Sequence, residues 1–233
     1  MTPPKSLVFL IDDDASVRKG VTRLLRSAGY QSEMFASASD FLARAQYPGP
    51  CCVIVDVRMP GLNGIDLQEA LIQRRRDEQL IFITGYGDIS MCAQAMKAGA
   101  VDFLPKPFRN TELLHCVARA LVRSAEQRRR SAERDKARAL LDLLTPREFE
   151  VMQLVIRGML NKQIAGELGI AEKTIKVHRG RVMQKLGAVS VPDLVRVARR
   201  AGVATGSASA TTRIKLASGG IRVMSANHVR PPA

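Results

Sequence analysis

Short apolar runs alternate with amphipathic stretches through the first half of the chain. Runs such as Leu7–Ile11 and Cys51–Val55 are rich in branched aliphatic side chains, which is typical of strands buried on both faces. Between these runs, apolar residues recur with the spacing of one packed helix face. The predicted strands are 7–11, 30–35, 51–55, 80–83 and 101–104, and the predicted helices are 17–28, 39–46, 65–74, 88–99 and one that begins at 110 or 111. This alternation predicts an α/β fold in which helices cover both faces of a five-stranded parallel sheet.

Polar residues lie at the ends of four predicted strands. Asp12 and Asp13 follow the first strand, Asp56 follows the third, Thr84 follows the fourth, and Lys106 lies two residues after the fifth. The carboxyl ends of parallel strands share one edge of the sheet, where open α/β sheets bind ligands. Each of these residues alone would more often be a solvated strand end, but their convergence predicts a site.

Three carboxylates at one point repel each other unless a cation lies among them. Mg²⁺ fits such a position because it takes oxygen ligands and binds through one or two carboxylates together with waters and phosphate oxygens. We expect Asp56 to be the nucleophile, Asp13 a direct ligand, Asp12 a ligand through water, and the backbone carbonyl of Arg58 a further ligand. The hydroxyl and ammonium at the neighbouring strand ends would hold a phosphoryl group. The expected product is an aspartyl phosphate.

Four segments of the first half, IDDD, IVDVRMPGLNG, FITGYGD and DFLPKPF, resemble the receiver domain of two-component response regulators. The resemblance covers residues 5–123 and implies a flavodoxin-like sheet with strand order 2-1-3-4-5. It also implies that Asp56 accepts a phosphoryl group from a sensor histidine kinase, with Asp12, Asp13, Thr84 and Lys106 in the roles described above.

Two further features follow from this resemblance. The Lys106–Pro107 peptide bond is expected to be cis. Phe103 is expected to be a switch aromatic, whose ring turns inward when Thr84 moves toward the phosphoryl group. The alternative for Phe103 is an ordinary core phenylalanine.

Residues 124–142 are rich in alanine and charge and contain neither Gly nor Pro. They predict a helical linker, with a flexible tether as the alternative. After the linker, Thr145, Pro146 and Glu148 have the spacing of a helix start with a capping box. Gly158 would end this first helix.

Three more helices are predicted beyond Gly158. Asn161 is expected to cap the second helix, Glu172 to begin the third, and Ser190 to cap the fourth. The second and third are joined by a tight turn at Gly169, and the third carries many basic residues, which predicts a helix-turn-helix with its recognition helix in the major groove.

The predicted recognition helix has an apolar stripe of Ile175, Val182 and Leu186. The opposite side should face DNA. We expect Lys176, Val177 and Gly180 to face base edges, and Lys173, Thr174, Arg179, Arg181 and Lys185 to contact phosphates.

The segments LTPRE, GMLNKQIAGELGI and KTIKVHR resemble the LuxR-type DNA-binding domain over residues 143–200. Together, residues 1–200 resemble the FixJ/NarL class of transcriptional regulators. The expected organisation is a receiver at 5–123, a helical charged linker at 124–142, an all-α four-helix DNA-binding domain at 143–200 and a disordered tail at 201–233.

Charge and composition agree with a nucleic-acid partner. The chain has a net charge of +14, and residues 126–233 carry 21 Lys and Arg against 9 Asp and Glu. Such a basic half favours a polyanion, with an acidic membrane surface as the alternative to nucleic acid. The sequence shows no long apolar run and no signal peptide, so a cytoplasmic protein is expected. The four cysteines lack metal or disulfide spacing and are expected to be reduced core thiols.

These observations predict a transcription factor that is switched by phosphorylation of Asp56. Its expected partners are a sensor histidine kinase, promoter DNA and a second copy of the chain, with RNA polymerase as a further candidate. One alternative is a DNA-binding regulator whose receiver serves only for dimerisation. The other is a phosphohydrolase working through an aspartyl phosphate, but Arg58 occupies the position where such enzymes place an acid and base. We therefore expect no enzyme activity beyond slow self-dephosphorylation.

Overall fold

The computed structural model describes residues 5–85, 93 and 95–204. The chain divides into two compact units, Met1–Arg129 and Arg130–Ala233. The elements of the first unit are β1 (Leu7–Ile11), α1 (Ala15–Ser27), β2 (Gln31–Phe35), α2 (Ala38–Ala43), β3 (Cys51–Asp56), α3 (Gly64–Gln73), β4 (Gln79–Thr84), β5 (Asp102–Pro105) and the first part of α5 (Asn110–Leu141).

The five strands form one parallel sheet in the order β2-β1-β3-β4-β5, which confirms the predicted order. The register pairs Ile11 with Val55 and Thr84 with Pro105. The carboxyl ends of the four strands that precede or carry the predicted site residues therefore lie at one edge.

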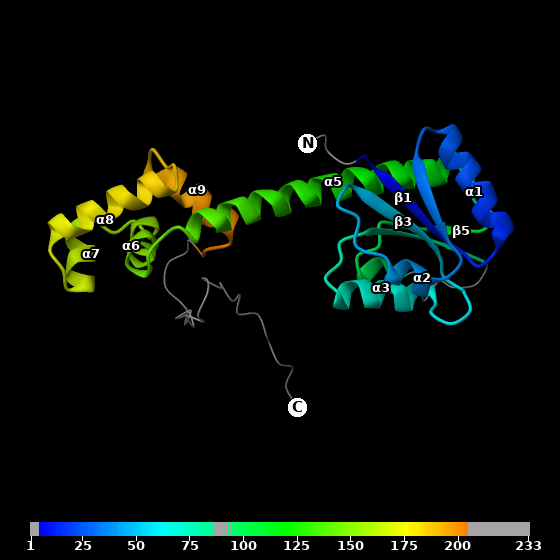
Figure 1. Ribbon diagram of the computed structural model, residues 1–233, viewed down its shortest axis with the longest axis horizontal. Coiled ribbons are helices and arrows are strands. Elements are labelled where there is room, and N and C mark those ends of the chain that lie inside the picture. Colours follow the sequence, from blue (N-terminus) through cyan, green and yellow to red (C-terminus); the bar gives the residue numbers. More distant parts are fainter. Residues whose placement is uncertain (1–4, 86–92, 94, 205–233) are drawn as a thin grey trace, which may run out of the picture. The chain divides into compact units, whose positions relative to one another are not determined.

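Helices cover both faces of this sheet (Figure 1). The core on one face joins Val21 and Leu25 of α1 to Val117 of α5. The core on the other face joins Phe41 of α2 and Leu67 of α3 to the sheet. Strands β1, β3 and β4 are buried along their whole length because both of their faces are covered, whereas the edge strand β2 is largely exposed.

Some predicted boundaries shift in the structure. Strand β3 extends one residue further and includes Asp56. Helix α2 begins at Ala38, after the cap residue Ser37, and ends at Ala43, so it is shorter than expected. Half of the predicted helix 88–99 falls outside the described residues, and residues 95–97 are helical. The Lys106–Pro107 bond is cis, as expected.

The second unit is all-helical among the residues that the structure describes. It holds the end of α5 together with α6 (Pro146–Ile156), α7 (Asn161–Leu168), α8 (Glu172–Lys185) and α9 (Val191–Ala201). Its core includes Ala137 and Leu141 from α5. Helix α6 starts as predicted, with Thr145 as the cap, Pro146 in the first turn and Glu148 completing the capping box.

The predicted cap of α7 is wrong. The cap residue is Leu160, whose amide donates to Oε1 of Gln163 at 2.8 Å. Asn161 is the first helical residue, and its Oδ1 accepts a hydrogen bond from Arg179 instead. The start of α7 is therefore stabilised by the Gln163 side chain, which accepts from the Leu160 amide, and not by the expected cap from the Asn161 side chain.

The remaining predictions concern cysteines, membranes and the tail. Cys51, Cys52 and Cys116 are buried and free, whereas Cys92 lies outside the described residues. Burial raises the pKa of Cys51 and of Cys116 to about 11, so both thiols are protonated at neutral pH. Among the described residues, no helix is long and apolar enough to span a membrane. The tail prediction falls almost entirely on 205–233, outside the described residues.

Candidate functional site: an acidic strand edge and a basic helix

Lys106 joins two carboxylates at the carboxyl edge of the sheet. Its Nζ lies 2.8 Å from Oδ2 of Asp12 and 2.6 Å from Oδ2 of Asp56. The side chain of Asp12 is fully buried and Asp56 is nearly so. Three residues that are far apart in sequence therefore meet where the strand-end pattern predicted.

Asp13 completes an acidic cluster with Asp12 and Asp56. One carboxylate oxygen from each lies within 4.8 Å of the others. Asp13 is exposed, whereas the other two are buried. Oxygen donors at this spacing, open to solvent on one side, suit a hard divalent cation that keeps several waters. The residues present therefore fit the predicted magnesium site.

The environment of this cluster shifts two pKa values in the same direction. Burial raises the pKa of Asp12, and the hydrogen bond from Lys106 only partly offsets this effect. Burial also disfavours the charge of Lys106, but its hydrogen bonds to Asp12 and Asp56 outweigh burial and raise its pKa. Lys106 is therefore a cation at neutral pH and partly neutralises the acidic cluster.

Two of the other predicted site residues, Thr84 and Arg58, form hydrogen bonds to Lys106 and Asp56. The Lys106 amide donates to the carbonyl oxygen of Thr84 at 2.6 Å, and Thr84 is buried. The Arg58 amide donates to Oδ1 of Asp56 at 3.2 Å. Phe103 is partly buried, with its ring centroid 6.4 Å from that of Phe82.

Two residues that hydrogen-bond to Asp12 were not predicted from the sequence. Asp14 caps α1 by accepting from the Ser16 amide, and its own amide donates to Oδ1 of Asp12 at 2.8 Å. Arg18 donates from Nη1 to the carbonyl oxygen of Asp12 at 2.5 Å. The preference of aspartate for helix caps could have identified Asp14, whereas the contact of Arg18 carries no sequence signal.

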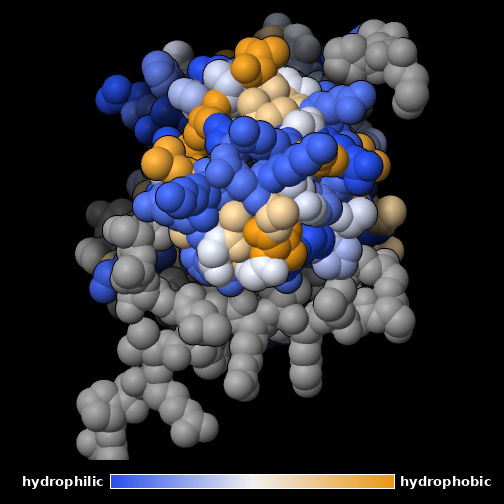
Figure 2. Space-filling view, turned by 90° about the vertical axis from the view of Figure 1, so that its left-hand side faces the viewer, coloured by the Kyte–Doolittle hydropathy of each residue, from blue (hydrophilic) through white to orange (hydrophobic). Residues whose placement is uncertain are grey.

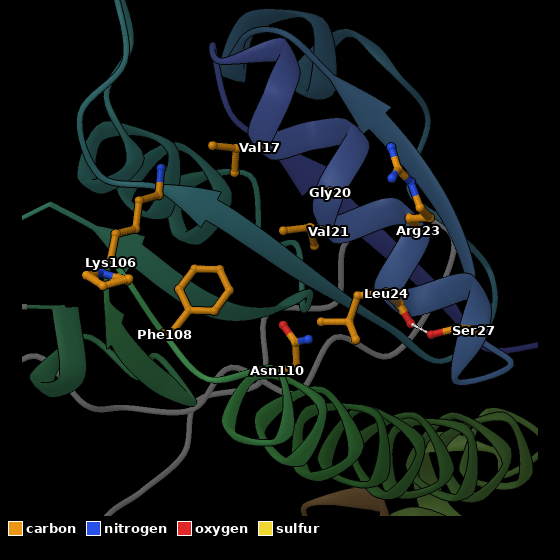
Figure 3. Close-up of a pocket in the computed structure, with 10 residues that line it drawn as sticks. Val17, Gly20, Val21, Arg23, Leu24, Ser27, Lys106, Phe108 and Asn110 are labelled. Atoms are coloured by element: carbon orange, nitrogen blue, oxygen red, sulfur yellow. Dashed lines mark hydrogen bonds between the residues drawn. The ribbon is translucent and has the colours of Figure 1, made fainter.

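A groove lies beside Lys106, between α1 and the start of α5 (Figure 3). Its volume is about 650 Å³. The lining residues are Val17, Gly20, Val21, Arg23, Leu24, Ser27, Lys106, Pro107, Phe108 and Asn110. The groove is mainly apolar, with basic groups at Arg23 and Lys106.

The basic helix α8 of the second unit has one buried and one exposed face. Ile175, Val182 and Leu186 are buried, which confirms the predicted apolar stripe. Six of the eight residues predicted to contact DNA are exposed, and the other two, Arg179 and Lys185, are partly buried; the exposed ones are Lys173, Thr174, Lys176, Val177, Gly180 and Arg181. Hydrophilic side chains cover much of the described surface viewed from the side of α7 and α8 (Figure 2).

Two of the predicted DNA contacts form hydrogen bonds within the second unit, and a third, Lys176, forms an exposed ion pair with Glu172 at 3.7 Å. Nζ of Lys185 lies 2.7 Å from Oε2 of buried Glu148 and donates to the carbonyl oxygen of Leu143. Nη1 of Arg179 donates to Oδ1 of Asn161 at 3.0 Å. Burial opposes the charge of Glu148, but the hydrogen bonds from Lys185 and Thr145 together with the charge of Lys185 outweigh burial and lower the pKa of Glu148.

The first unit is a parallel sheet covered by helices, with three carboxylates and a lysine at one edge. The second unit carries a helix-turn-helix with a basic second helix. Together these two units define the class of response regulators. Comparisons with known families agree with this class. Residues 8–118 match the response regulator receiver domain, and residues 142–198 match the bacterial regulatory proteins of the luxR family.

Relatives extend over both units. Nodulation protein W of Bradyrhizobium diazoefficiens is 46% identical over 201 residues, covering 85% of this chain and 88% of that protein. Transcriptional regulatory protein FixJ of Azorhizobium caulinodans is 41% identical, covering 86% of this chain and 96% of that protein. The solved structure of response regulator StyR has 48% identity and a TM-score of 0.74, covering 84% of this chain and all of that one. Full-length FixJ from B. japonicum has 39% identity and a TM-score of 0.51, covering 85% of this chain and 98% of that one.

The chain therefore belongs to the FixJ/NarL class of two-component response regulators. It is a transcriptional regulator with a receiver domain and a LuxR-type DNA-binding domain.

Proposed function

We propose that Asp56 accepts a phosphoryl group from the phosphohistidine of a sensor kinase. An oxygen of the Asp56 carboxylate attacks phosphorus, the P–N bond breaks, and its electron pair returns to the imidazole of the donor, which takes up a proton. Asp13, Asp56 and the backbone carbonyl of Arg58 would hold Mg²⁺, with Asp12 binding through water. When bound, Mg²⁺ supplies positive charge to the phosphoryl oxygens.

The contact of Lys106 with both Asp12 and Asp56 is the observation that carries this proposal. Its ammonium lies 2.6 Å from the acceptor carboxylate, so it stands beside any phosphoryl group attached there. Lys106 would bind one phosphoryl oxygen, and the hydroxyl of Thr84 would bind another. Phosphorylation would thus convert the Asp56 carboxylate into a larger anion that lies between two hydrogen-bond donors, Lys106 and Thr84.

The same donors provide a switch. Movement of Thr84 toward the phosphoryl group would make room for the Phe103 ring, which packs partly buried against Phe82. The phosphoryl group would thereby shift an existing equilibrium between two receiver conformations. The favoured conformation would form a homodimer through residues 88–99 and β5, and two DNA-binding units would then engage two half-sites.

The groove of Figure 3 is the surface that we assign to the kinase. A donor protein must bring its phosphohistidine to Asp56, so it must cover surface beside Lys106. A mainly apolar groove along α1 suits the apolar face of a partner helix. Gly20→Leu should fill the groove and slow phosphorylation by a sensor kinase, while phosphorylation by acetyl phosphate, which needs no docking, stays unchanged.

DNA recognition is assigned to the exposed face of α8. Lys176, Val177 and Gly180 would face base edges, with the Val177 side chain suited to a thymine methyl group. Lys173, Thr174, Arg179, Arg181 and Lys185 would position the helix through phosphates. RNA polymerase is the further partner that a promoter-bound regulator would meet, and the cytoplasm is where all these partners are found together.

The proposed organisation follows these functions. The receiver spans 5–123, the charged linker 124–142, the DNA-binding domain 143–200 and the tail 201–233. Self-dephosphorylation should be slow because Arg58 occupies the position where phosphohydrolases use an acid and base.

Incubation with acetyl phosphate and Mg²⁺ tests the acceptor assignment. Intact-mass measurement should show one added phosphoryl group on the wild type and none on Asp56→Asn, and a chelator should abolish the addition. An added phosphoryl group on Asp56→Asn would show that another residue is the acceptor. Sustained turnover of phosphate esters would instead favour the phosphohydrolase alternative.

A further inference from the structure

Helix α5 is bound to the sheet edge opposite the acceptor site. At this edge β3 begins with Cys51 and β4 begins with Gln79. The buried hydroxyl of Ser124 accepts a hydrogen bond from the Cys51 amide at 3.0 Å. Oε1 of Gln127 accepts from Nε2 of Gln79 at 2.9 Å. One helix therefore contacts the first residues of two neighbouring strands.

Arg128 adds three hydrogen bonds at the same edge. It donates to the carbonyl oxygen of Tyr47 at 2.8 Å and to that of Pro48 at 3.1 Å. It also lies 3.2 Å from Oδ1 of Asp77, the residue two positions before β4. These bonds hold the segments that lead into β3 and β4, and charge-assisted bonds of this kind are stronger than neutral ones.

Ser124, Gln127 and Arg128, which we call the clasp, have the i, i+3, i+4 spacing that places side chains on one helix face. The structure assigns this stretch to the first unit. The proposed linker, 124–142, therefore begins with residues whose side chains bond to the receiver. The first unit ends at Arg129.

The clasp contacts the two strands that end at Asp56 and Thr84, the proposed phosphoryl acceptor and phosphoryl-binding residue. Strand β3 begins at Cys51 and ends at Asp56, and β4 begins at Gln79 and ends at Thr84. Both strands are six residues long and buried throughout. Tightly packed strands move as units rather than bending locally, so a displacement at one end of such a strand also shifts its other end.

We infer that the clasp couples the phosphorylation state of the receiver to helix α5, which leads in sequence to the DNA-binding unit. This inference rests on the proposed phosphorylation of Asp56. Phosphorylation alters the carboxyl ends of β3 and β4, and the clasp passes the change from their amino ends to α5. Loss of the clasp uncouples DNA binding from phosphorylation without affecting the acceptor site.

The test compares full-length wild type with Arg128→Ala and with the milder Gln127→Ala. Arg129→Ala is the matched control, because it removes the same charge from an exposed neighbouring position. Hydrogen exchange of amides 124–136 in the unphosphorylated protein should be faster in Arg128→Ala by about tenfold and unchanged in Arg129→Ala. Equal protection in Arg128→Ala and the wild type would overturn the clasp itself.

The second measurement is the gain in affinity for a promoter fragment, selected by wild-type binding, after treatment with acetyl phosphate and Mg²⁺. Arg128→Ala should incorporate the phosphoryl group at the wild-type rate but lose most of this gain, and Gln127→Ala should lose part of it. A full gain in Arg128→Ala would refute the coupling while leaving the proposed function intact. Absence of any gain in the wild type would refute the proposed switch, and the exchange experiment would still decide whether the clasp exists.

Discussion

At Gly64, the start of α3 lies against the backbone of Asp56. A Cβ at this position would lie 2.6 Å from the carbonyl oxygen of Asp56 and 3.1 Å from Cα of Val57. Backbone atoms cannot move aside cheaply, so Gly64→Ala should shift the acceptor loop, destabilise the receiver by about 1–3 kcal/mol and slow phosphorylation by acetyl phosphate. Denaturant unfolding and phosphoryl incorporation measure the two effects.

Gly20→Ala is the control for this prediction. Gly20 lies inside α1, and a Cβ there would contact nothing within 4 Å. Alanine should therefore stabilise the helix by about 1 kcal/mol and leave the rate with acetyl phosphate unchanged. Equal effects of the two substitutions would contradict the close approach at Gly64.

Glu148 should make the stability of the second unit depend on pH in the acid range. The pKa of Glu148 in the folded protein is lowered from its ordinary value of 4.5, so its stabilising contribution is complete above that pH. The contribution is lost as the pH falls through the lower folded pKa. The stability difference between wild type and Glu148→Gln, measured by urea unfolding, should be constant near neutral pH and shrink below about pH 4.5. A difference that grows in acid would contradict the assigned direction.

At the scale of elements, a residue with a strained backbone lies two positions after the end of α3. Arg75 has a φ of 54°, in the left-handed region that favours glycine. Arg75→Gly should therefore raise the free energy of unfolding of the receiver by about 0.5–1 kcal/mol. Arg74→Gly serves as the comparison, because Arg74 has a negative φ and donates to the carbonyl oxygen of Leu42. It should be destabilising.

Helix α8 separates residues that hold the fold from residues available to DNA. Lys173→Ala should leave the melting temperature unchanged and reduce the slope of log affinity against log salt by about 0.9, the value for one phosphate contact. Lys185→Ala should destabilise the second unit by about 1–2 kcal/mol, because it leaves buried Glu148 without its cation. Thermal melts and salt titrations of operator binding separate the two roles. An unchanged melting temperature for Lys185→Ala would contradict a structural role for its contact with Glu148.

The same elements show what a sequence pattern can predict. Strand periodicity and the shared edge of a parallel sheet were enough to place Asp12, Asp56 and Lys106 together, because strand direction alone brings their positions to one place. The start of α6 was predictable because its capping box is local in sequence. The cap of α7 was mispredicted because a glutamine three residues on can replace a short capping side chain.

At the scale of the whole molecule, long-range contacts of polar side chains escaped prediction. Arg128 bonds to Tyr47 across 81 residues, and Lys185 bonds to Glu148 across 37. Neither contact follows a helix or strand period, and both arginine and lysine are usually solvated on helix surfaces. Only the folded chain shows that Ser124, Gln127 and Arg128 bond to the receiver and that Lys185 bonds to Glu148 within the second unit.

The central claim is that one carboxylate controls DNA binding. The most direct measurement is the affinity of wild type and Asp56→Asn for a promoter fragment, each with and without acetyl phosphate and Mg²⁺. The wild type should bind more tightly after treatment, and Asp56→Asn should give the same weak binding in both conditions. Identical binding curves for the two proteins in both conditions would contradict the account and favour a receiver that serves only for dimerisation.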